Sequence, residues 1–399
     1  MIRFRGRLLS AIKRTGDRVC TPEETLDRVR PLLPRAGITR LADVTGLDRL
    51  GLPTVLAFRP NALSMSVSCG KGLTRPAAAA AAAMEAVEGF SAETLRGEEF
   101  VAGYERVRAE RPCLEPDELP LADGGLFDAT RPVPWVMGWD LGSESEIAVP
   151  ARVADLVPTY QDAFGFTAFR RSGNGLSAGN HLLEAILNGL TEVVERDAVG
   201  CTLAAALRGY LPPHVDPDGW PSPPVREVRQ RARDLGFELG FFDRTVDTAV
   251  PTYEATLTDR GGTGETYHGF GAHLDPAAAM MRAATEAMQI RLTYITGSRD
   301  ELFRTAHQRD RTQTPTVPRR SGPAPARSSD ATDSLDGDVR VLLNKLAAVG
   351  IHRVVVCDLT HPRLGIPVVR VFVPGLENGL DERFRPGVRG QQFAREVGR

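Results

Sequence analysis

Glutamate residues recur at helical spacing in three separate stretches of the sequence. In the longest stretch, counting about 100° per residue of helix, Glu195 lies about 20° and Glu192 about 80° from Glu184. Asn180 lies about 40° away on the other side of Glu184, so that the four polar side chains share one face. Such a face is usually just solvated, and Glu192 with Arg196 could be an ordinary surface ion pair.

Two observations favour a functional face instead. Acidic residues recur on the other two stretches: Glu85 and Glu88 lie one turn apart in an alanine-rich segment, and Glu286 follows Arg282 by one turn. In addition, the Gly- and Ser-rich loop SGNGLSAG at residues 172–179 leads directly into the longest stretch. The free backbone N–H groups at the start of a helix favour bound anions.

If the three helices converge, up to six glutamates share one cleft, and so many carboxylates require cations. Mg²⁺ prefers carboxylate oxygens and commonly binds together with phosphates, so the pattern predicts ATP with Mg²⁺. The chain lacks the P-loop motif GxxxxGK[ST]. The predicted metal ligands are Glu85, Glu88, Glu184, Glu192, Glu195 and Glu286. The basic residues placed to meet the phosphates of the nucleotide are Lys71, Arg196, Arg282 and Arg291, and no catalytic residue is assigned.

Composition excludes several classes of protein. The chain has 399 residues, 42% of them hydrophobic, which is enough for a sizeable core. The net charge of −2 does not favour a nucleic acid or an anionic membrane as partner. Five scattered cysteines without a Cys-x-x-Cys pair indicate neither a disulfide framework nor a zinc site. Since no apolar run is long enough to span a bilayer, we expect a cytoplasmic protein that does not bind membranes.

Hydrophobic periodicity and turn residues predict alternating helices and strands, and therefore an α/β (or α+β) fold. Residues 308–335 are rich in Pro, Ser and Arg and predict a mobile loop. The predicted helices cover residues 22–34, 76–90, 180–199, 225–235, 276–294 and 341–349. The predicted strands cover residues 38–44, 54–58, 64–68, 237–242, 252–257, 351–357 and 368–373.

The same stretches, with the strings that connect them, resemble the YcaO family, whose members use ATP to activate backbone amides of peptides. The resemblance spans residues 21–380. The resemblance is specific because three acidic helix motifs occur in the family's order. A single Glu-x-x-Glu motif would be weak evidence. The matching strings are ITRLADVTGLD (38–48), SVSCGKG (66–72), MEAVE (84–88), GLSAGNHLLEAI (175–186), EVVERDA (192–198), TEAMQIRLTY (285–294), GIPVVR (365–370) and PGLE (374–377).

The resemblance implies strand–helix subunits around a central nucleotide, in a single catalytic domain over residues 21–380 with terminal extensions at 1–20 and 381–399. It also implies a homodimer that acts on a ribosomally made precursor peptide. By position, Glu85 and Glu88 match the first acidic motif and Glu286 matches the third. The second motif is matched by Asn180, Glu184, Glu192, Glu195 and Arg196. The resemblance further implies that Asn180 and Gln289 bind the nucleotide together with the basic residues.

The first acidic motif departs from the family pattern. It usually reads Ser-x-x-x-Glu-x-x-Glu-Arg, but Ala81 stands here at the serine position and Gly89 at the arginine position. A hydroxyl and a cation are therefore missing on one side of the expected site. All the acidic residues of the family pattern are present, which favours a site that still binds ATP and Mg²⁺.

Family members differ in the nucleophile that attacks the activated amide. A side chain or the N-terminal amine of the same peptide gives an azoline or amidine ring, and external sulfide with a TfuA-type partner gives a thioamide. The chain lacks a Pro-x-Pro-x-Pro tail, and residues 1–20 leave no room for a fused adaptor domain. With the altered first motif, this favours a stand-alone ring-forming enzyme, with thioamide formation as the alternative. A non-catalytic peptide-binding scaffold is the alternative of another class.

Overall fold

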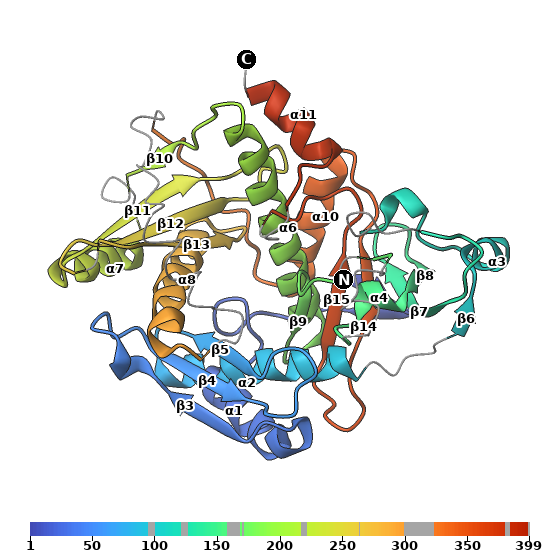
Figure 1. Cartoon of the computed structure of the whole chain (residues 1–399), viewed down its shortest axis with the longest axis horizontal. Helices are drawn as coiled ribbons and strands as arrows, with labels where there is room; N and C mark the ends of the chain where they lie inside the picture. Colours follow the sequence, from blue (N-terminus) through green and yellow to red (C-terminus); the bar gives the residue numbers. More distant parts are fainter. Residues whose placement is uncertain are drawn as a thin grey trace.

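The protein consists of three units, each built from a β-sheet and a helix that covers it. The helices α2 (Arg75–Glu93), α6 (Leu182–Ala206) and α8 (Pro276–Thr296) meet in the middle of the molecule, with the sheets around them (Figure 1). The predicted alternation of helices and strands is confirmed. The computed structural model describes residues 1–94, 100–120, 127–157, 168–169, 171–216, 222–262, 264–298, 323–379 and 384–397.

The first unit is a three-stranded antiparallel sheet covered by α2. Thr74 caps this helix, because its side chain accepts a hydrogen bond from the backbone N–H of Ala77 at 3.3 Å. The run of alanines that follows favours helix. The strand order is β3 (Arg40–Asp43), β4 (Thr54–Phe58) and β5 (Val67–Lys71).

The alanine run also allows α2 to approach the sheet very closely at Gly70 of β5. A Cβ atom on Gly70 would lie 2.1 Å from the backbone nitrogen of Ala82 and 2.2 Å from the carbonyl oxygen of Ala78. No side chain fits there, so the helix and strand backbones are in direct contact. This contact fixes the position of α2, and with it the position of the first acidic motif.

The second unit is a four-stranded antiparallel sheet. Its helix α8 packs on β13 and β12, and α7 (Pro223–Asp234) packs on β11. Asp275 caps α8 by accepting a hydrogen bond from the N–H of Ala278 at 2.9 Å, and Gly297 ends it in the left-handed conformation. The strand order is β10 (His214–Val215), β11 (Phe237–Asp243), β12 (Thr252–Asp259) and β13 (Thr266–Ala272).

The third unit is a six-stranded sheet, on which α6 packs against β15 and β9. The helices α10 (Leu335–Ala348) and α11 (Val388–Val397) in turn pack on α6. The strand order is β6 (Phe100–Ala102), β7 (Val133–Asp140), β14 (Val355–Asp358), β15 (Val368–Phe372) and β9 (Leu176–Ala178), with β8 (Ser145–Pro150) paired to β7. The other helices of the described residues are α1 (Pro22–Val29), α3 (Tyr104–Glu110) and α4 (Ala151–Ala154), with 3₁₀ turns at Arg30–Ala36, Thr45–Leu47 and Pro116–Glu118.

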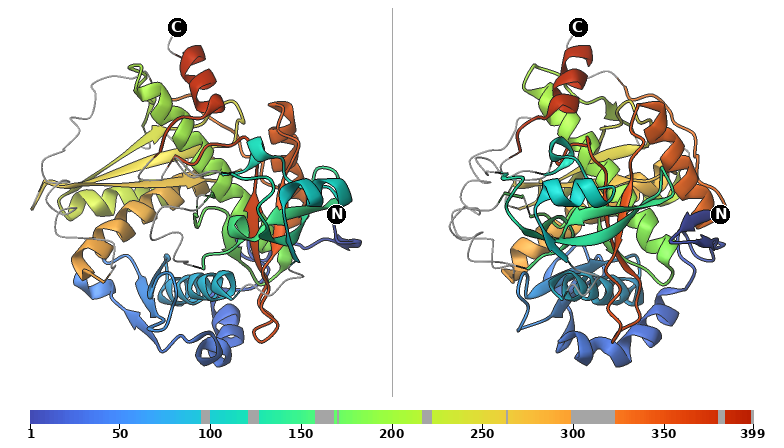
Figure 2. Two further views of the ribbon diagram at one scale, coloured as in Figure 1. Left: turned by 45° about the vertical axis from the view of Figure 1, so that its right-hand side comes forward. Right: turned by 90° about the vertical axis from the view of Figure 1, so that its right-hand side faces the viewer.

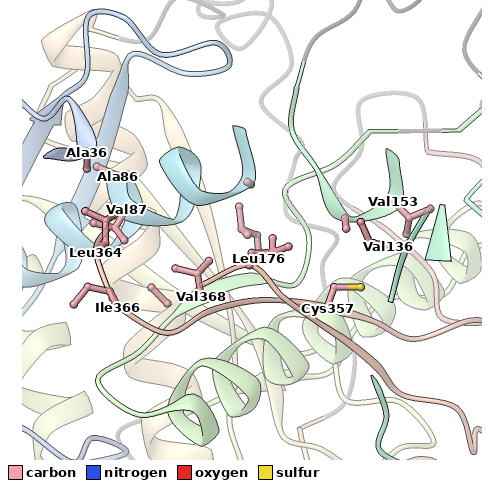
Figure 3. Close-up of a cluster of buried hydrophobic side chains, with 14 of the residues drawn as sticks. Ala36, Ala86, Val87, Val136, Val153, Leu176, Cys357, Leu364, Ile366 and Val368 are labelled. Atoms are coloured by element: carbon pink, nitrogen blue, oxygen red, sulfur yellow. The ribbon is translucent and has the colours of Figure 1, made fainter. Parts of the chain in front are cut away.

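A continuous hydrophobic core joins the first and third units. Ala86 and Val87 of α2 belong to the same buried cluster as Leu176 of β9 and Val368 of β15 (Figure 3). Burial of this apolar surface is the main force that holds α2 against the third sheet. The first acidic helix and the third unit therefore form one packed body.

The N-terminal segment is part of this body, although residues 1–20 were predicted to be an extension. The hairpin of β1 (Ile2–Phe4) and β2 (Arg7–Leu9) lies beside α10 (Figure 2). The amino group of Met1 contacts Asp336 at 2.7 Å, and Lys13 forms an ion pair with the buried Asp338. These contacts hold the segment against the start of α10.

Two further segments are packed more firmly than predicted. Residues 323–335 belong to the predicted mobile loop, but Arg327 forms an ion pair with Asp243 at 2.8 Å and Ser334 caps α10. Residues 308–322 lie outside the described residues. In the predicted C-terminal extension, Arg389 of α11 binds the fully buried Asp197 at 2.8 Å. Asp197, on the apolar side of α6, thus holds the C-terminal helix in place through Arg389.

Element boundaries differ from prediction where backbone contacts decide them. The predicted strand 64–68 becomes β5 at Val67–Lys71, because its register is set by pairing with β4. The predicted helix 22–34 ends at Val29 and continues as a 3₁₀ turn that contains Pro34. Strand β13 was not predicted, because its sequence TYHGFGA has little regular alternation.

The contact at Gly70 generates a test of the fold. We expect Gly70→Ala to lower the free energy of unfolding by at least about 1–3 kcal/mol, since the new methyl group overlaps the backbone of α2. Gly46→Ala is the matched control, because nothing lies within 4 Å of the Cβ position there. Urea unfolding measures both variants, and equal stability of Gly70→Ala and wild type would contradict the close packing.

Candidate active site

A cavity of about 1810 Å³ lies between α2, α6, α8 and the N-terminal segment. Ten of the twelve predicted site residues line it, although they come from stretches of the chain that lie far apart in sequence, from Lys71 to Glu286. The lining residues from the predicted set are Lys71, Glu85, Glu88, Asn180, Glu184, Glu192, Glu195, Arg196, Arg282 and Glu286.

Backbone N–H groups beside β9 hold two of the glutamates from different helices. Glu88 of α2 accepts a hydrogen bond from the N–H of Ala178 at 2.6 Å. Glu192 of α6 accepts one from the N–H of Gly175 at 3.3 Å. The Gly- and Ser-rich loop that was predicted to bind anions through its N–H groups therefore binds the protein's own carboxylates.

Strand β13 holds the other two glutamates in the same way. The N–H of Ala272 donates to Glu195 of α6 at 2.9 Å, and the N–H of Phe270 donates to Glu286 of α8 at 3.1 Å. Each of these four hydrogen bonds involves one carboxylate oxygen. The carboxylates are thus fixed in place by neutral backbone donors, and the second oxygen of Glu192 and of Glu195 contacts Arg196.

The buried glutamates of the cavity are in an environment that would be stabilised by an additional cation. Burial and the neighbouring Glu85 raise the pKa of Glu88 well above its usual range. Burial, Glu286 and Glu192 raise the pKa of Glu195 to about 7, although Arg196 opposes this shift. Arg196 lies 3.1 Å from Glu195 and 3.4 Å from Glu192, and it cannot neutralise the whole cluster.

The donor set fits Mg²⁺ bound together with a phosphate-bearing ligand. Among the residues that the structure describes, no three His, Cys, Asp or Glu side chains lie close enough to form a closed metal site. Mg²⁺ usually takes one or two carboxylates and completes its octahedron with water and substrate phosphates. Carboxylates in pairs, with arginines beside them, suit this mode of binding better than an all-protein cage.

Glu184 lines the cavity but is engaged differently from its predicted role as a metal ligand. It is 1% exposed, and its oxygens accept hydrogen bonds from Arg18 Nη1 at 3.0 Å and from the N–H of Val19 at 3.2 Å. The N–H of Asn180 lies 3.3 Å from the same carboxylate. These donors occupy both oxygens, so Glu184 acts here as the anchor of the N-terminal segment.

The N-terminal segment also supplies Asp17, which the sequence did not single out. Asp17 contacts His273 Nε2 and lies 3.4 Å from Arg282 and 3.1 Å from Lys13. Side-chain hydrogen bonding and the charge of His273 hold the pKa of Asp17 far below its usual range, despite burial. Asp17 thereby orients Arg282 at the cavity, and no spacing in the sequence connects the two residues.

Two predicted nucleotide-binding residues do not line the cavity. Arg291 of α8 is buried and forms ion pairs with Asp48 at 3.1 Å and Asp259 at 3.3 Å. Gln289 donates a hydrogen bond from Nε2 to the carbonyl oxygen of Cys69. Both side chains join α8 to neighbouring elements, so the structure assigns them to packing.

Sequence reasoning also missed several polar side chains of the cavity wall, among them Asn188, Arg59 and Arg171. Asn188 lies one turn after Glu184 and one turn before Glu192, and the same helical spacing could have found it. Arg59 follows β4 and lines the cavity beside Gly89. Only the tertiary structure brings it there, because β4 and the end of α2 are far apart in sequence.

Comparison with known sequences identifies the class of protein. The sequence model of the family described as YcaO cyclodehydratase, ATP- and Mg²⁺-binding, matches residues 69–377. A protein from the tfuA 3′ region of Rhizobium leguminosarum bv. trifolii, itself uncharacterised, is 34% identical over 92% of this chain and 90% of its own length. An uncharacterised protein of Methanothermobacter thermautotrophicus is 35% identical over 89% of this chain and 94% of its own length.

Solved structures agree with this assignment. YcaO from Methanopyrus kandleri, bound with AMPPCP and Mg²⁺, superposes with a TM-score of 0.74 at 27% identity, over 96% of this chain and 98% of that one. A heterocyclase in complex with substrate and cofactor gives a TM-score of 0.79 at 26% identity over 93% of this chain. The present chain spans about half of that heterocyclase, 54% of its length.

The chain therefore belongs to the YcaO family. It is an ATP-dependent enzyme with ATP and Mg²⁺ as cofactors, and not a non-catalytic scaffold. Within the described residues, no helix is both long and apolar enough to cross a membrane.

The pairing of carboxylates generates a binding prediction. We expect Glu192→Gln and Glu195→Gln each to weaken binding of a non-hydrolysable ATP analogue in the presence of Mg²⁺ by at least about tenfold, because even indirect partners of a metal typically contribute that much. Calorimetric titration with and without Mg²⁺ measures the effect. Glu227→Gln, on the exposed face of α7, is the control and should bind like wild type.

For Arg291 the structure predicts a role in stability and none in nucleotide binding. Arg291→Met leaves the buried Asp48 without its ion-pair partner and removes one of the two arginines that pair with Asp259, the other being Arg49. We expect a loss of about 3–5 kcal/mol in the free energy of unfolding. The folded variant should bind the Mg²⁺–nucleotide as wild type does. A large loss of nucleotide affinity with unchanged stability would mean that Arg291 belongs to the site after all.

Proposed function

We propose that this enzyme activates a backbone amide of a ribosomally made precursor peptide. A nucleophile adds to the amide carbon, the amide oxygen receives the terminal phosphoryl group of ATP, and that oxygen leaves as phosphate with ADP as the other product. The observation that carries the proposal is the cavity in which glutamates of α2, α6 and α8 converge beside arginines. Phosphoryl transfer depends mainly on positioning and charge neutralisation, which such a site provides.

The roles of individual residues in this proposal follow from their contacts. Glu88, Glu192, Glu195 and Glu286, each fixed by a backbone N–H, would hold Mg²⁺, and Glu85 lies on the same face of α2. Mg²⁺ would supply charge neutralisation at the phosphates. Arg282, oriented by Asp17, and Arg196, held between two glutamates, are the cations placed to bind phosphate oxygens.

For the nucleophile we propose external sulfide, delivered with a TfuA-type partner, so that the peptide amide becomes a thioamide. The relative in the tfuA 3′ region, similar over 90% of its length, supports this assignment. The sequence had favoured ring formation because Gly89 leaves the first motif without its arginine. That reason is weak, because the missing arginine belongs to the nucleotide side of the site and does not specify which nucleophile attacks the amide.

Ring formation by a nucleophile of the same peptide is the second candidate, and mass spectrometry distinguishes the two reactions. The cognate peptide would be incubated with the enzyme, ATP and Mg²⁺, with and without sulfide and the TfuA-type partner. We expect a sulfur-for-oxygen mass increase that requires sulfide. Loss of one water without sulfide would show ring formation instead. Glu192→Gln should abolish either change, whereas Glu227→Gln should not.

A further inference from the structure

The end of the cavity beside the last turns of α2 carries a guanidinium group that the reaction described above does not use. The side chain of Arg59 is only 6% exposed. Its Nε donates to the carbonyl oxygen of Ala36 at 3.2 Å, and its Nη2 donates to Glu93 at 2.6 Å. Glu93 also accepts a hydrogen bond from the N–H of Ser64 at 2.9 Å, so both of its oxygens are occupied. These contacts fix the guanidinium in one orientation.

The third nitrogen of Arg59 is directed at the space that Gly89 leaves open. A Cβ atom on Gly89 would lie 2.8 Å from Nη1, and both residues line the cavity. In the part of the chain that the structure describes, Nη1 has no hydrogen-bond acceptor. A nearly buried, rigidly held guanidinium therefore presents a free N–H edge to the cavity.

A second guanidinium lies at the same end of α2. Arg171 lines the cavity and donates from Nη1 to the carbonyl oxygen of Leu156 at 3.3 Å, and the N–H of Leu156 binds the carbonyl oxygen of Ala92 at 3.1 Å. Gly89, Ala92 and Glu93 share one face of the helix. Arg59 is thus attached to α2 through Glu93, and Arg171 is attached to it through Leu156. Both lie at the C-terminal end of the helix, where the macrodipole favours cations.

Two features separate this end of the cavity from the acidic centre. The volume of about 1810 Å³ exceeds the roughly 300–1,000 Å³ of a site for one small molecule, so a second ligand has room beside the nucleotide. In addition, Met65 lines the same cavity and is 42% exposed. A charged group next to apolar surface suits a peptide better than a polyphosphate.

We propose that Arg59 and Arg171 form an anion subsite that binds a carboxylate of the peptide substrate, from an acidic side chain or the C-terminus. The inference rests on the proposed function in taking the substrate to be a peptide. Gly89 is part of the subsite, because any side chain at this position would displace the guanidinium of Arg59. A phosphate of the nucleotide carries the same kind of anionic oxygen, and the experiment separates the two sources.

The test uses two pools of acetylated, C-terminally amidated pentapeptides that differ only in glutamate or glutamine at the central position. Binding of each pool to the full-length protein is measured with and without a non-hydrolysable ATP analogue and Mg²⁺. We expect wild type to bind the glutamate pool about tenfold to a hundredfold more tightly, the range for a hydrogen bond to a charged group. Arg59→Met and Arg171→Met should each lose this preference and keep the affinity for the nucleotide analogue.

Three further variants keep the test decisive. Arg59→Met leaves Glu93 buried without its partner, so the double variant Arg59→Met with Glu93→Gln is measured if the single variant fails to fold. Gly89→Ala should reduce the preference without removing any charge. Arg14→Met is the matched control, because Arg14 is exposed, pairs with Glu24 on the surface and does not line the cavity.

The outcomes are separable. Equal binding of the two pools together with weaker nucleotide binding by Arg59→Met and Arg171→Met would assign the arginines to phosphate and overturn the peptide-carboxylate site. Equal binding of the pools with unchanged nucleotide affinity would overturn the anion subsite altogether. Failure of wild type to bind the Mg²⁺–nucleotide would contradict the proposed function, while the comparison of the two pools would still decide the subsite.

Discussion

The structure depends on keeping several buried carboxylates close to one another without neutralising them permanently. Burial and the repulsion between like charges raise the pKa of Glu88 and of Glu195. The protein fixes these carboxylates with backbone N–H groups from Ala178 and Ala272, and uses few cationic side chains for the purpose. A backbone donor holds a carboxylate in position but leaves its charge available, which is the requirement for recruiting Mg²⁺.

That requirement explains the architecture around the cavity. Each acidic helix packs on its own sheet, so its acidic face is free to point inward. Two of the glutamates are nevertheless held by another unit: Glu88 of α2 by β9 of the third unit, and Glu195 of α6 by β13 of the second unit. Close backbone contact, as at Gly70 of β5 against α2, keeps these distances short. A small shift of one unit would break hydrogen bonds made by another.

The departures of this chain from the family pattern are concentrated at one end of the cavity. Gly89 stands where the first acidic motif usually has an arginine. Arg59, the residue after β4 of the same unit, places a guanidinium beside Gly89. The charge is therefore present, but it is held by Glu93 and offset from the acidic centre. Because the guanidinium of Arg59 lies away from the acidic centre, it can contact a different ligand from the one that an arginine at position 89 would contact.

The sequence alone determined the helices α2, α6 and α8, their acidic faces and the family, because the 3.6-residue period and the spacing of glutamates are local properties of the chain. It also identified ten residues of the cavity wall. Only the tertiary structure decided that Glu184 anchors the segment around Arg18, that Arg291 is a packing residue, and that Asp17 and Arg59 reach the cavity. The physical reason is that a side chain's partner is set by contacts between distant segments. A carboxylate on a polar face looks the same in sequence whether a metal, an arginine or a backbone N–H meets it.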